Sequence, residues 1–347
     1  MPRMLRLASA ARACLIAALP FCALIPKAHA NEADFFKGKT VRLVNGGAAG
    51  SGYDLYSRML APWLTKELQA TVIVESRPGA GMMTAMNHVW GAAPDGLTIM
   101  LAPGEGAVIA KLTDDPAIRF DLTKFPIVAR VNTAPRVLIV YPDGPFKTMA
   151  DFANPPKTIF IGANGKTDGA SDTSAVVCHA LKLPCKIMIG YPSSKEFSMA
   201  AIRGEVDGTI LVDDSAMRYS DNGQLRALAV MSRERAPLMP KVPTIFEELK
   251  LDAEAIWWLD FREDLRKIGR LLVTPPGVSK ERLAYLRAVT KKILNDKDAL
   301  AEFEQRNQPA LYGDPEEMTR LVTKALDGSI GETRLRELKH VITEKYY

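Results

Sequence analysis

Short runs of β-branched and apolar residues alternate along this chain with amphipathic segments of about 10 to 15 residues, which is typical of strands joined by crossover helices. Strands are expected at Val41 to Val44, Thr71 to Glu75 and Leu97 to Ala102, with helices at Asp54 to Leu68 and Met82 to Trp90. Because such crossovers are almost always right-handed, these three strands should be parallel. The pattern predicts an α/β fold.

The same alternation resumes after residue 130 and continues almost to the end. The expected strands here are Val137–Tyr141, Ile159–Gly162, Ile187–Tyr191, Gly208–Val212, Leu225–Met231 and Leu271–Thr274, with helices at Ser171–Leu181 and Lys195–Arg203. A chain of 347 residues is long enough for two cores. No internal repeat or low-complexity tract is present.

The first 30 residues have the features of a secretory signal. Arg3, Arg6 and Arg12 form a basic start, residues 13–25 are an apolar run interrupted only by Pro20, and Ala28-His29-Ala30 offers small residues for signal peptidase. A membrane anchor would need about 20 uninterrupted apolar residues, and Cys22 lacks the preceding small residue of a lipoprotein. We expect cleavage after Ala30 and a mature protein outside the cytoplasm.

The formal charge of +5 comes mostly from that segment, since four basic residues and no acidic one precede residue 31. Without them, 41 basic residues face 40 acidic ones. A nearly neutral chain gives no electrostatic reason to bind nucleic acid or anionic lipid.

Two cysteines, Cys178 and Cys185, remain after removal of the segment, and an oxidising compartment favours a disulfide between them. A metal site or a nucleophilic thiol has less support, because no Cys-x-x-Cys or His-rich spacing surrounds them. His88, His179 and His340 form no His-x-x-x-His pair, so a zinc site is not expected. Asp114, Asp115 and Asp121 are best explained as a solvated loop.

Ligands of open parallel sheets bind at the carboxyl ends of the strands, and two glycine-rich loops follow the first two strands. The first loop leads into a helix, and the N-terminus of a helix suits an anion. Asp54 is a natural N-cap for this helix. The candidate ligand residues of the first loop are Ala49, Gly50, Ser51, Gly52, Tyr53 and Asp54. Glycine turns without ligands are common, so this loop alone leaves the question open.

The second loop also leads directly into a helix and adds a second set of N–H donors beside the first. Its candidate ligand residues are Gly79, Ala80, Gly81 and Met82. Arg77 could hold a charged ligand, but a surface or interdomain ion pair is the preferred interpretation.

At these residues the sequence resembles the Bug-type substrate-binding receptors of tripartite tricarboxylate transporters. The matching segments are Gly50-Ser51-Gly52-Tyr53-Asp54 with Arg58, Glu75-Ser76-Arg77-Pro78-Gly79-Ala80-Gly81, Ala93-Pro94-Asp95-Gly96, Gly204-Glu205-Val206-Asp207, Leu225-Arg226-Ala227-Leu228-Ala229-Val230, Val242-Pro243-Thr244, Thr274-Pro275-Pro276-Gly277-Val278 and Gly313-Asp314-Pro315-Glu316-Glu317. They occur in order over nearly the whole mature chain.

The resemblance implies a type II periplasmic binding protein, with two α/β lobes and a ligand cleft between them. Residues 31–131 and 243–347 would form lobe 1, and residues 132–242 would form lobe 2. Such a receptor is a monomer without cofactor or catalytic activity. It holds a small carboxylate largely through backbone N–H groups and ordered waters and passes it to the membrane subunits of the transporter.

Lobe 2 departs from the family pattern where the family shapes ligand choice. Ala175 stands where a His is usual. By spacing, Leu211-Val212 occupy the place of the Asp-Asn pair that the family has after its strand, and Asp213-Asp214 follow one turn later. The candidate ligand residues on this side are Asn164, Gly165, Ser193, Ser194 and Asp213, although Asp213 suits a helix cap equally well. This polar set favours an aliphatic or polar carboxylate over a bare aromatic acid. Lys166 is either a partner for a second carboxylate or an exposed loop lysine.

Three other functions compete with this interpretation. A dinucleotide-binding enzyme is suggested by the glycines before the first helix, Gly47, Gly50 and Gly52, and by Glu75 at the end of the next strand. The spacing of these glycines differs from the Gly-x-Gly-x-x-Gly pattern of such enzymes. A hydrolase would need a Gly-x-Ser-x-Gly elbow, which is missing from the sequence. A binding protein that presents its ligand to a sensor, with no transport role, remains an alternative that sequence does not separate from transport.

Overall fold

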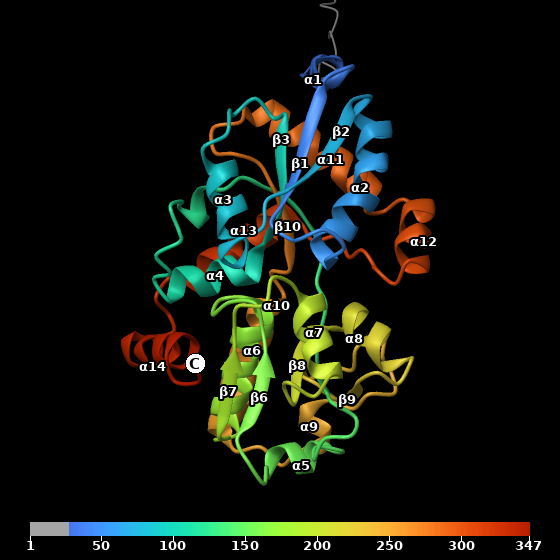
Figure 1. Ribbon diagram of the computed structural model, residues 1–347. Coiled ribbons are helices and arrows are strands. Elements are labelled where there is room, and N and C mark those ends of the chain that lie inside the picture. Colours follow the sequence, from blue (N-terminus) through green and yellow to red (C-terminus); the bar gives the residue numbers. More distant parts are fainter. Residues whose placement is uncertain (1–27) are drawn as a thin grey trace, which may run out of the picture.

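A computed structural model describes residues 28–347 of the chain, and its elements form two lobes, one above the other in Figure 1. Most of the expected export signal, residues 1–27, lies outside the described residues. Within residues 28–347, no helix combines the length and apolar character needed to cross a membrane.

The first lobe is built on a five-stranded sheet. Its strand order is β2 (Thr71–Ser76), β1 (Thr40–Asn45), β3 (Thr98–Pro103), β10 (Arg270–Val273), β4 (Ile127–Asn132). β1 pairs in parallel with both β2 and β3, as the crossover argument predicts. β10 runs antiparallel between β3 and β4, so a strand from late in the chain completes this sheet.

The second lobe contains the other five-stranded sheet. Its order is β7 (Cys185–Met188), β6 (Ile159–Gly162), β8 (Gly208–Val212), β5 (Arg136–Val140), β9 (Arg226–Val230). β6 is parallel to β7 and β8, whereas β5 is antiparallel to β8 and β9.

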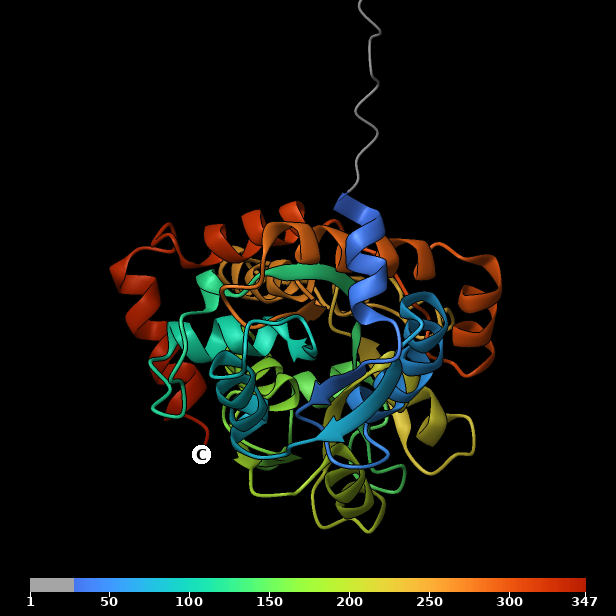
Figure 2. The same ribbon diagram turned by 90° about the horizontal axis from the view of Figure 1, so that it is seen from above.

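Helices cover both sheets, and in the view from above the orange-to-red C-terminal helices lie along one side of the molecule (Figure 2). The α-helices are α1 (Ala28–Phe36), α2 (Gly52–Leu68), α3 (Met83–Trp90), α4 (Gly104–Leu112), α5 (Met149–Ala153), α6 (Gly169–Ala180), α7 (Ser194–Ile202), α8 (Asp213–Ser220), α9 (Ile245–Glu248), α10 (Ala253–Arg266), α11 (Lys280–Ile293), α12 (Lys297–Gln305), α13 (Pro315–Leu326) and α14 (Glu332–Thr343). Two short 3₁₀ turns, η1 (Ala80–Met82) and η2 (Leu122–Lys124), complete the list.

Helix α2 begins at Gly52, two residues before the expected start, because Ser51 is its N-cap and not Asp54. The Ser51 hydroxyl accepts from the backbone N–H of Asp54 over 3.4 Å. Further along, Tyr56, Leu60 and Leu64 recur every four residues and are fully buried against the sheet.

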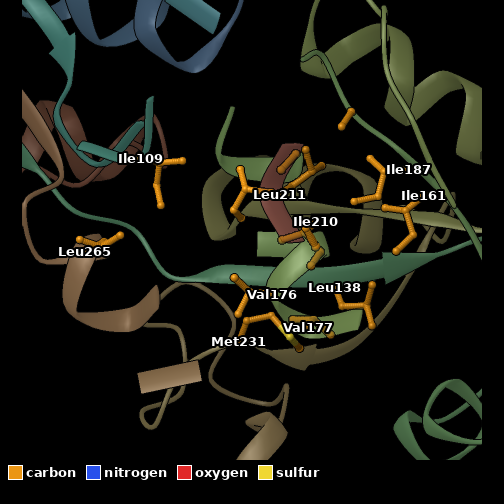
Figure 3. Packing of buried hydrophobic residues seen from close by; sticks show 14 of the residues in the cluster. Ile109, Leu138, Ile161, Val176, Val177, Ile187, Ile210, Leu211, Met231 and Leu265 are labelled. Carbon is orange, nitrogen blue, oxygen red and sulfur yellow. The ribbon is translucent and has the colours of Figure 1, made fainter. Parts of the chain in front are cut away.

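Two hydrophobic clusters hold the lobes. One fills a face of the first sheet beneath α2, α11 and α12. The other packs the second sheet and continues without a break through α10 and α4 to the opposite face of the first sheet. Figure 3 shows members of this cluster, with Val176 and Val177 of α6 beside Leu138 and Ile210 of the second sheet and with Leu265 and Ile109 from α10 and α4. The two lobes therefore share one apolar core.

The expected return of the chain to lobe 1 at residue 243 differs from the observed packing. α9 contacts β9, and α10 and α14 both contact α6, so these three helices lie against the second lobe. α13, in contrast, packs on β4 and α4 of the first lobe. The chain thus passes between lobes at 132–136, at 266–270 and at 326–332.

Candidate functional site

A cavity of about 370 Å³ lies between the two lobes and is lined by residues from both. Eleven of the candidate ligand residues line it: Ser51, Gly52, Tyr53, Gly79, Ala80, Gly81, Met82, Asn164, Gly165, Ser193 and Ser194. Ala49, Gly50, Asp54 and Asp213 are not part of the lining. The carboxyl-end rule for parallel sheets explains why β1, β2 and β3 all end here.

The first glycine-rich loop is held in shape by Asp54. This carboxylate accepts hydrogen bonds from the Gly50 N–H at 2.8 Å, from Arg58 Nε at 3.0 Å and from the Ser76 hydroxyl at 3.3 Å. Burial alone raises the pKa of Asp54, but the hydrogen bonds from Arg58 and Gly50 bring the pKa below its ordinary value. Asp54 therefore organises the loop instead of facing a ligand.

The second loop has an unusual backbone. Gly79, Ala80, Gly81 and Met82 all have positive φ, at 134°, 46°, 59° and 75°. A left-handed conformation costs about 1 kcal/mol or more for Ala80 and for Met82, and such backbones turn successive N–H groups into a concave anion site. The two loops also touch, because a Cβ built on Gly46 would collide with the side chain of Met82.

Arg77 precedes this loop but does not line the cavity. Its guanidinium pairs with Glu75 at the surface, which agrees with the preferred interpretation of an ion pair.

A buried charge cluster forms one wall. Glu105, at the start of α4, accepts from Arg262 Nη1 over 3.0 Å and pairs with Arg136 of β5. Arg262 on α10 also donates from Nε to Asp172 Oδ1 of α6 over 2.7 Å, with the two residues 4% and 0% exposed. Burial raises the pKa of Glu105, but Arg136 and Arg262 outweigh it and lower the pKa to about 2. The cluster ties α4 of the first lobe to β5 and α6 of the second.

Arg270, the first residue of β10, also lines the cavity, next to the strand end that carries Glu105. Its Nη1 donates to Asn132 Oδ1 over 2.8 Å, and its guanidinium stacks 4.5 Å from the Tyr56 ring centre and 5.2 Å from that of Tyr53. Burial raises the pKa of Tyr53 to about 12, so its hydroxyl stays neutral.

The second lobe contributes the loop before α6. Asp168 caps that helix and accepts from the backbone N–H groups of Gly165 at 2.7 Å, Ala170 at 2.7 Å and Ser171 at 3.2 Å. Burial raises the pKa of this carboxyl above its ordinary value. Asn164 Nδ2 donates to the Tyr191 carbonyl over 2.9 Å, and Ser193 caps α7. Both candidate loops of lobe 2 thus end at helix N-termini beside the cavity.

Lys166 and Asp213 point elsewhere. Lys166 Nζ donates to the Thr343 carbonyl over 2.6 Å and lies over the Tyr347 ring. Asp213 is the first residue of α8, whose N-cap is Val212, so the prediction of a helix cap is wrong in its position. It is buried, and its Oδ1 accepts from the Asp214 N–H over 2.9 Å.

No group of three or more His, Cys, Asp or Glu side chains in residues 28–347 is arranged to hold a metal ion. Of the three loop carboxylates, Asp114 pairs with Lys339, Asp115 accepts from Thr167, and Asp121 caps η2. Cys178 and Cys185 are joined in a disulfide.

Residues 56–327 match the family model described as tripartite tricarboxylate transporter family receptor. The chain belongs to this family. A relative from Bordetella pertussis, a UPF0065 protein, is 28% identical to it over 289 residues, which cover 82% of this chain and 85% of that protein. Among solved structures, the periplasmic binding protein BugD is similar with a TM-score of 0.71 at 20% identity, over 87% of this chain and 97% of that one. MatC from Rhodopseudomonas palustris, solved with bound malate, has a TM-score of 0.70 at 21% identity, over 88% and 99% of the two chains.

These likenesses confirm the predicted family and the predicted fold of a periplasmic binding protein. Members of the receptor family bind solutes and are not enzymes, so the nucleotide-dependent enzyme considered from the glycine pattern is excluded.

Several residues that line the cavity were not among the predicted ligand residues. Glu105 follows the third parallel strand, so the strand-end rule that located the first two loops would have found it. Arg266 lies on α10, whose buried Ala255, Trp258, Leu259 and Leu265 follow a helical period that was overlooked. Arg136 and Arg270 each begin a strand, and no local sequence pattern marks them.

Proposed function

We propose that this family member captures a small organic carboxylate in the cavity between its lobes and delivers it to the membrane subunits of a tripartite transporter. The observation that carries the proposal is the convergence on one cavity of two glycine-rich loops, the N-terminus of α2 and the buried guanidinium of Arg270. N–H groups and guanidinium groups are both donors without an acceptor, and they suit an anion.

The cavity size supports a small ligand. A volume of about 370 Å³ is near the lower end of the range for ligand pockets, roughly 300 to 1,000 Å³. The malate bound in the MatC structure is an acid of the class proposed here.

Ligand choice is assigned to the second lobe. Asn164, Ser193 and Ser194 offer polar groups to the part of the ligand that lies away from the first lobe, and leaving such groups unpaired costs about 1 to 3 kcal/mol each. An aliphatic or polar carboxylate therefore fits better than a bare aromatic acid. Asp213 does not belong to this set, because it does not reach the lining of the cavity.

The proposed receptor is a monomer in the periplasm, exported by the N-terminal signal and cleaved after Ala30. Its two lobes, joined by the three crossings, close on the ligand by hinge motion.

Thermal unfolding of the purified mature protein tests this function. The ligands to be added are succinate, malate, citrate, benzoate and an amino acid. At least one of the aliphatic acids should raise the melting temperature, because a ligand that binds only the folded state stabilises it. Small-angle scattering with the same acid should show a more compact protein. If none of these acids moves the melting temperature, the proposal is wrong; if benzoate binds most tightly, the ligand preference is wrong.

A further inference from the structure

The charged side chains that line the cavity are almost all neutralised by protein groups. Asp168 accepts three backbone N–H groups, and Glu105 and Arg136 pair with each other. Arg266 donates to the Glu263 carboxylate through Nε at 2.7 Å and Nη2 at 2.5 Å. These groups have little left to offer a ligand.

Arg270 is the exception. The carboxylate found within 4 Å of it in the described part of the chain is that of Asp214, whose Oδ2 lies 3.7 Å from Nη2. This separation is too long for a hydrogen bond, and Asp214 Oδ2 has no hydrogen-bond partner among residues 28–347. Asp214 belongs to α8 of the second lobe, so the gap lies between the lobes. Arg270 is only 6% exposed and its charge is incompletely compensated.

The same Nη2 group of Arg270 lies beside the start of α2. A Cβ built on Gly52, the first residue of that helix, would lie 3.3 Å from Arg270 Nη2. An anion beside Gly52 therefore meets both a buried guanidinium and a helix N-terminus. The stack on Tyr53 and Tyr56 and the bond to Asn132 hold the guanidinium in place, which reduces the entropy lost on binding.

We infer that Arg270 is a specificity-determining residue of this receptor, binding a ligand carboxylate directly and so selecting the charged acid over its neutral amide. This inference rests on the proposed function, because it names the group that recognises the charge of that ligand. Backbone N–H donors already favour a carboxylate over an amide oxygen, and a buried guanidinium adds a full positive charge that increases this preference. Asp214 opposes this binding, since it competes for the same cation across the lobes.

Isothermal titration with two acid–amide pairs, succinate with the neutral diamide succinamide and benzoate with benzamide, tests the assignment. The wild type should bind at least one acid about tenfold or more tightly than its amide, as expected of a charge-assisted hydrogen bond. Arg270→Gln should lose most of that preference by weakening the acid and sparing the amide, and Arg270→Lys should keep more of it. A merely structural Arg270 would weaken acid and amide equally, and that result overturns the inference.

Asp214→Asn provides an independent measurement if Arg270→Gln fails to fold by circular dichroism. Removing the competing carboxylate should strengthen binding of the acid several-fold, and unchanged or weaker binding overturns the inference. Arg203→Gln, which removes a charge from an exposed pair with Glu205, is the control and should change neither affinity. A wild type that binds none of succinate, malate, citrate and benzoate contradicts the proposed function itself, whereas an intact acid preference in Arg270→Gln contradicts this inference alone.

Discussion

Thr167 of the second lobe donates a 3.0 Å hydrogen bond from its hydroxyl to Asp115 Oδ2 of the first lobe. The same hydroxyl faces Gly81, because a Cβ built there would lie 3.3 Å from Thr167 Oγ1. The lobes thus touch directly beside the cavity, at a point where one glycine approaches the opposite lobe.

Gly81→Ala should weaken carboxylate binding strongly, about tenfold or more, because the added methyl group presses on Thr167 and strains a residue with φ of 59°. Gly50→Ala is a matched control, since Gly50 has φ of 77° but open space around the added Cβ. Titration calorimetry should show that Gly50→Ala loses stability without a comparable loss of affinity. Equal losses of affinity would mean that backbone strain, and not contact between the lobes, decides the effect.

Glu105→Gln should destabilise the protein by about 3 kcal/mol or more, because it leaves Arg136 and Arg262 buried without their shared carboxylate. Urea unfolding at pH 7 measures the loss. Glu205→Gln removes a carboxylate from an exposed pair that is screened by solvent, so it should leave the free energy of unfolding nearly unchanged. Since the folded pKa of Glu105 is about 2, its contribution is complete above the unfolded pKa of about 4.3 and disappears as pH falls toward 2. The Glu105→Gln variant should lack this loss of stability at acid pH, because it has no carboxylate at this position.

Asp213→Asn should stabilise the protein at alkaline pH. Burial, reinforced by Asp214, raises the pKa of Asp213 to about 7, so the folded state keeps a proton that the unfolded chain releases near pH 4. The contribution of Asp213 to the free energy of unfolding of the wild type therefore falls as pH rises from 4 to 7. The variant should match the wild type at pH 4 and exceed it by up to about 4 kcal/mol at pH 8.

Denaturant unfolding at both pH values measures this difference, with the exposed Asp221→Asn as the control. A variant whose advantage is the same at pH 4 and pH 8 would show that Asp213 ionises normally in the folded protein.

Reduction of the Cys178–Cys185 disulfide should cost about 2.5 kcal/mol, the loop-closure entropy for so short a loop. The measurement is denaturant unfolding with and without dithiothreitol. A Cys178→Ala, Cys185→Ala double variant should not respond to the reductant. Two free thiols detected in the untreated protein would contradict the pairing.

The sequence predicted most of the strands and both glycine-rich loops because these signals are local. Ser51, Gly52 and the residues 79–82 carry their conformational preferences in their own types. Helix α10 was missed although its buried positions recur at helical spacing. β4 was missed because Ile127–Asn132 is an edge strand whose neighbour, β10, arrives from the far end of the chain.

The ion pairs around Glu105 could not be predicted from the sequence, for a different reason. The three residues are far apart in the chain: Glu105, Arg136 and Arg262. Each is of a charged type that is usually found at the surface. Their pairing depends on how the lobes pack. Arg270 likewise becomes notable only because Tyr53, Tyr56 and Asn132 come from other elements and surround it.

The position of β10 has a consequence for the order in which the chain folds. β5 to β9 lie within residues 136–230, so the second sheet is complete once this continuous segment has been made. The first sheet has β10 between β3 and β4, and its two parts stay separate until residues 270–273 have been synthesised. Because pairing distant segments is slow, the sheet that begins the chain is the one that is completed last, and its exposed strand edges are the part of the unfinished fold most in need of protection by a chaperone.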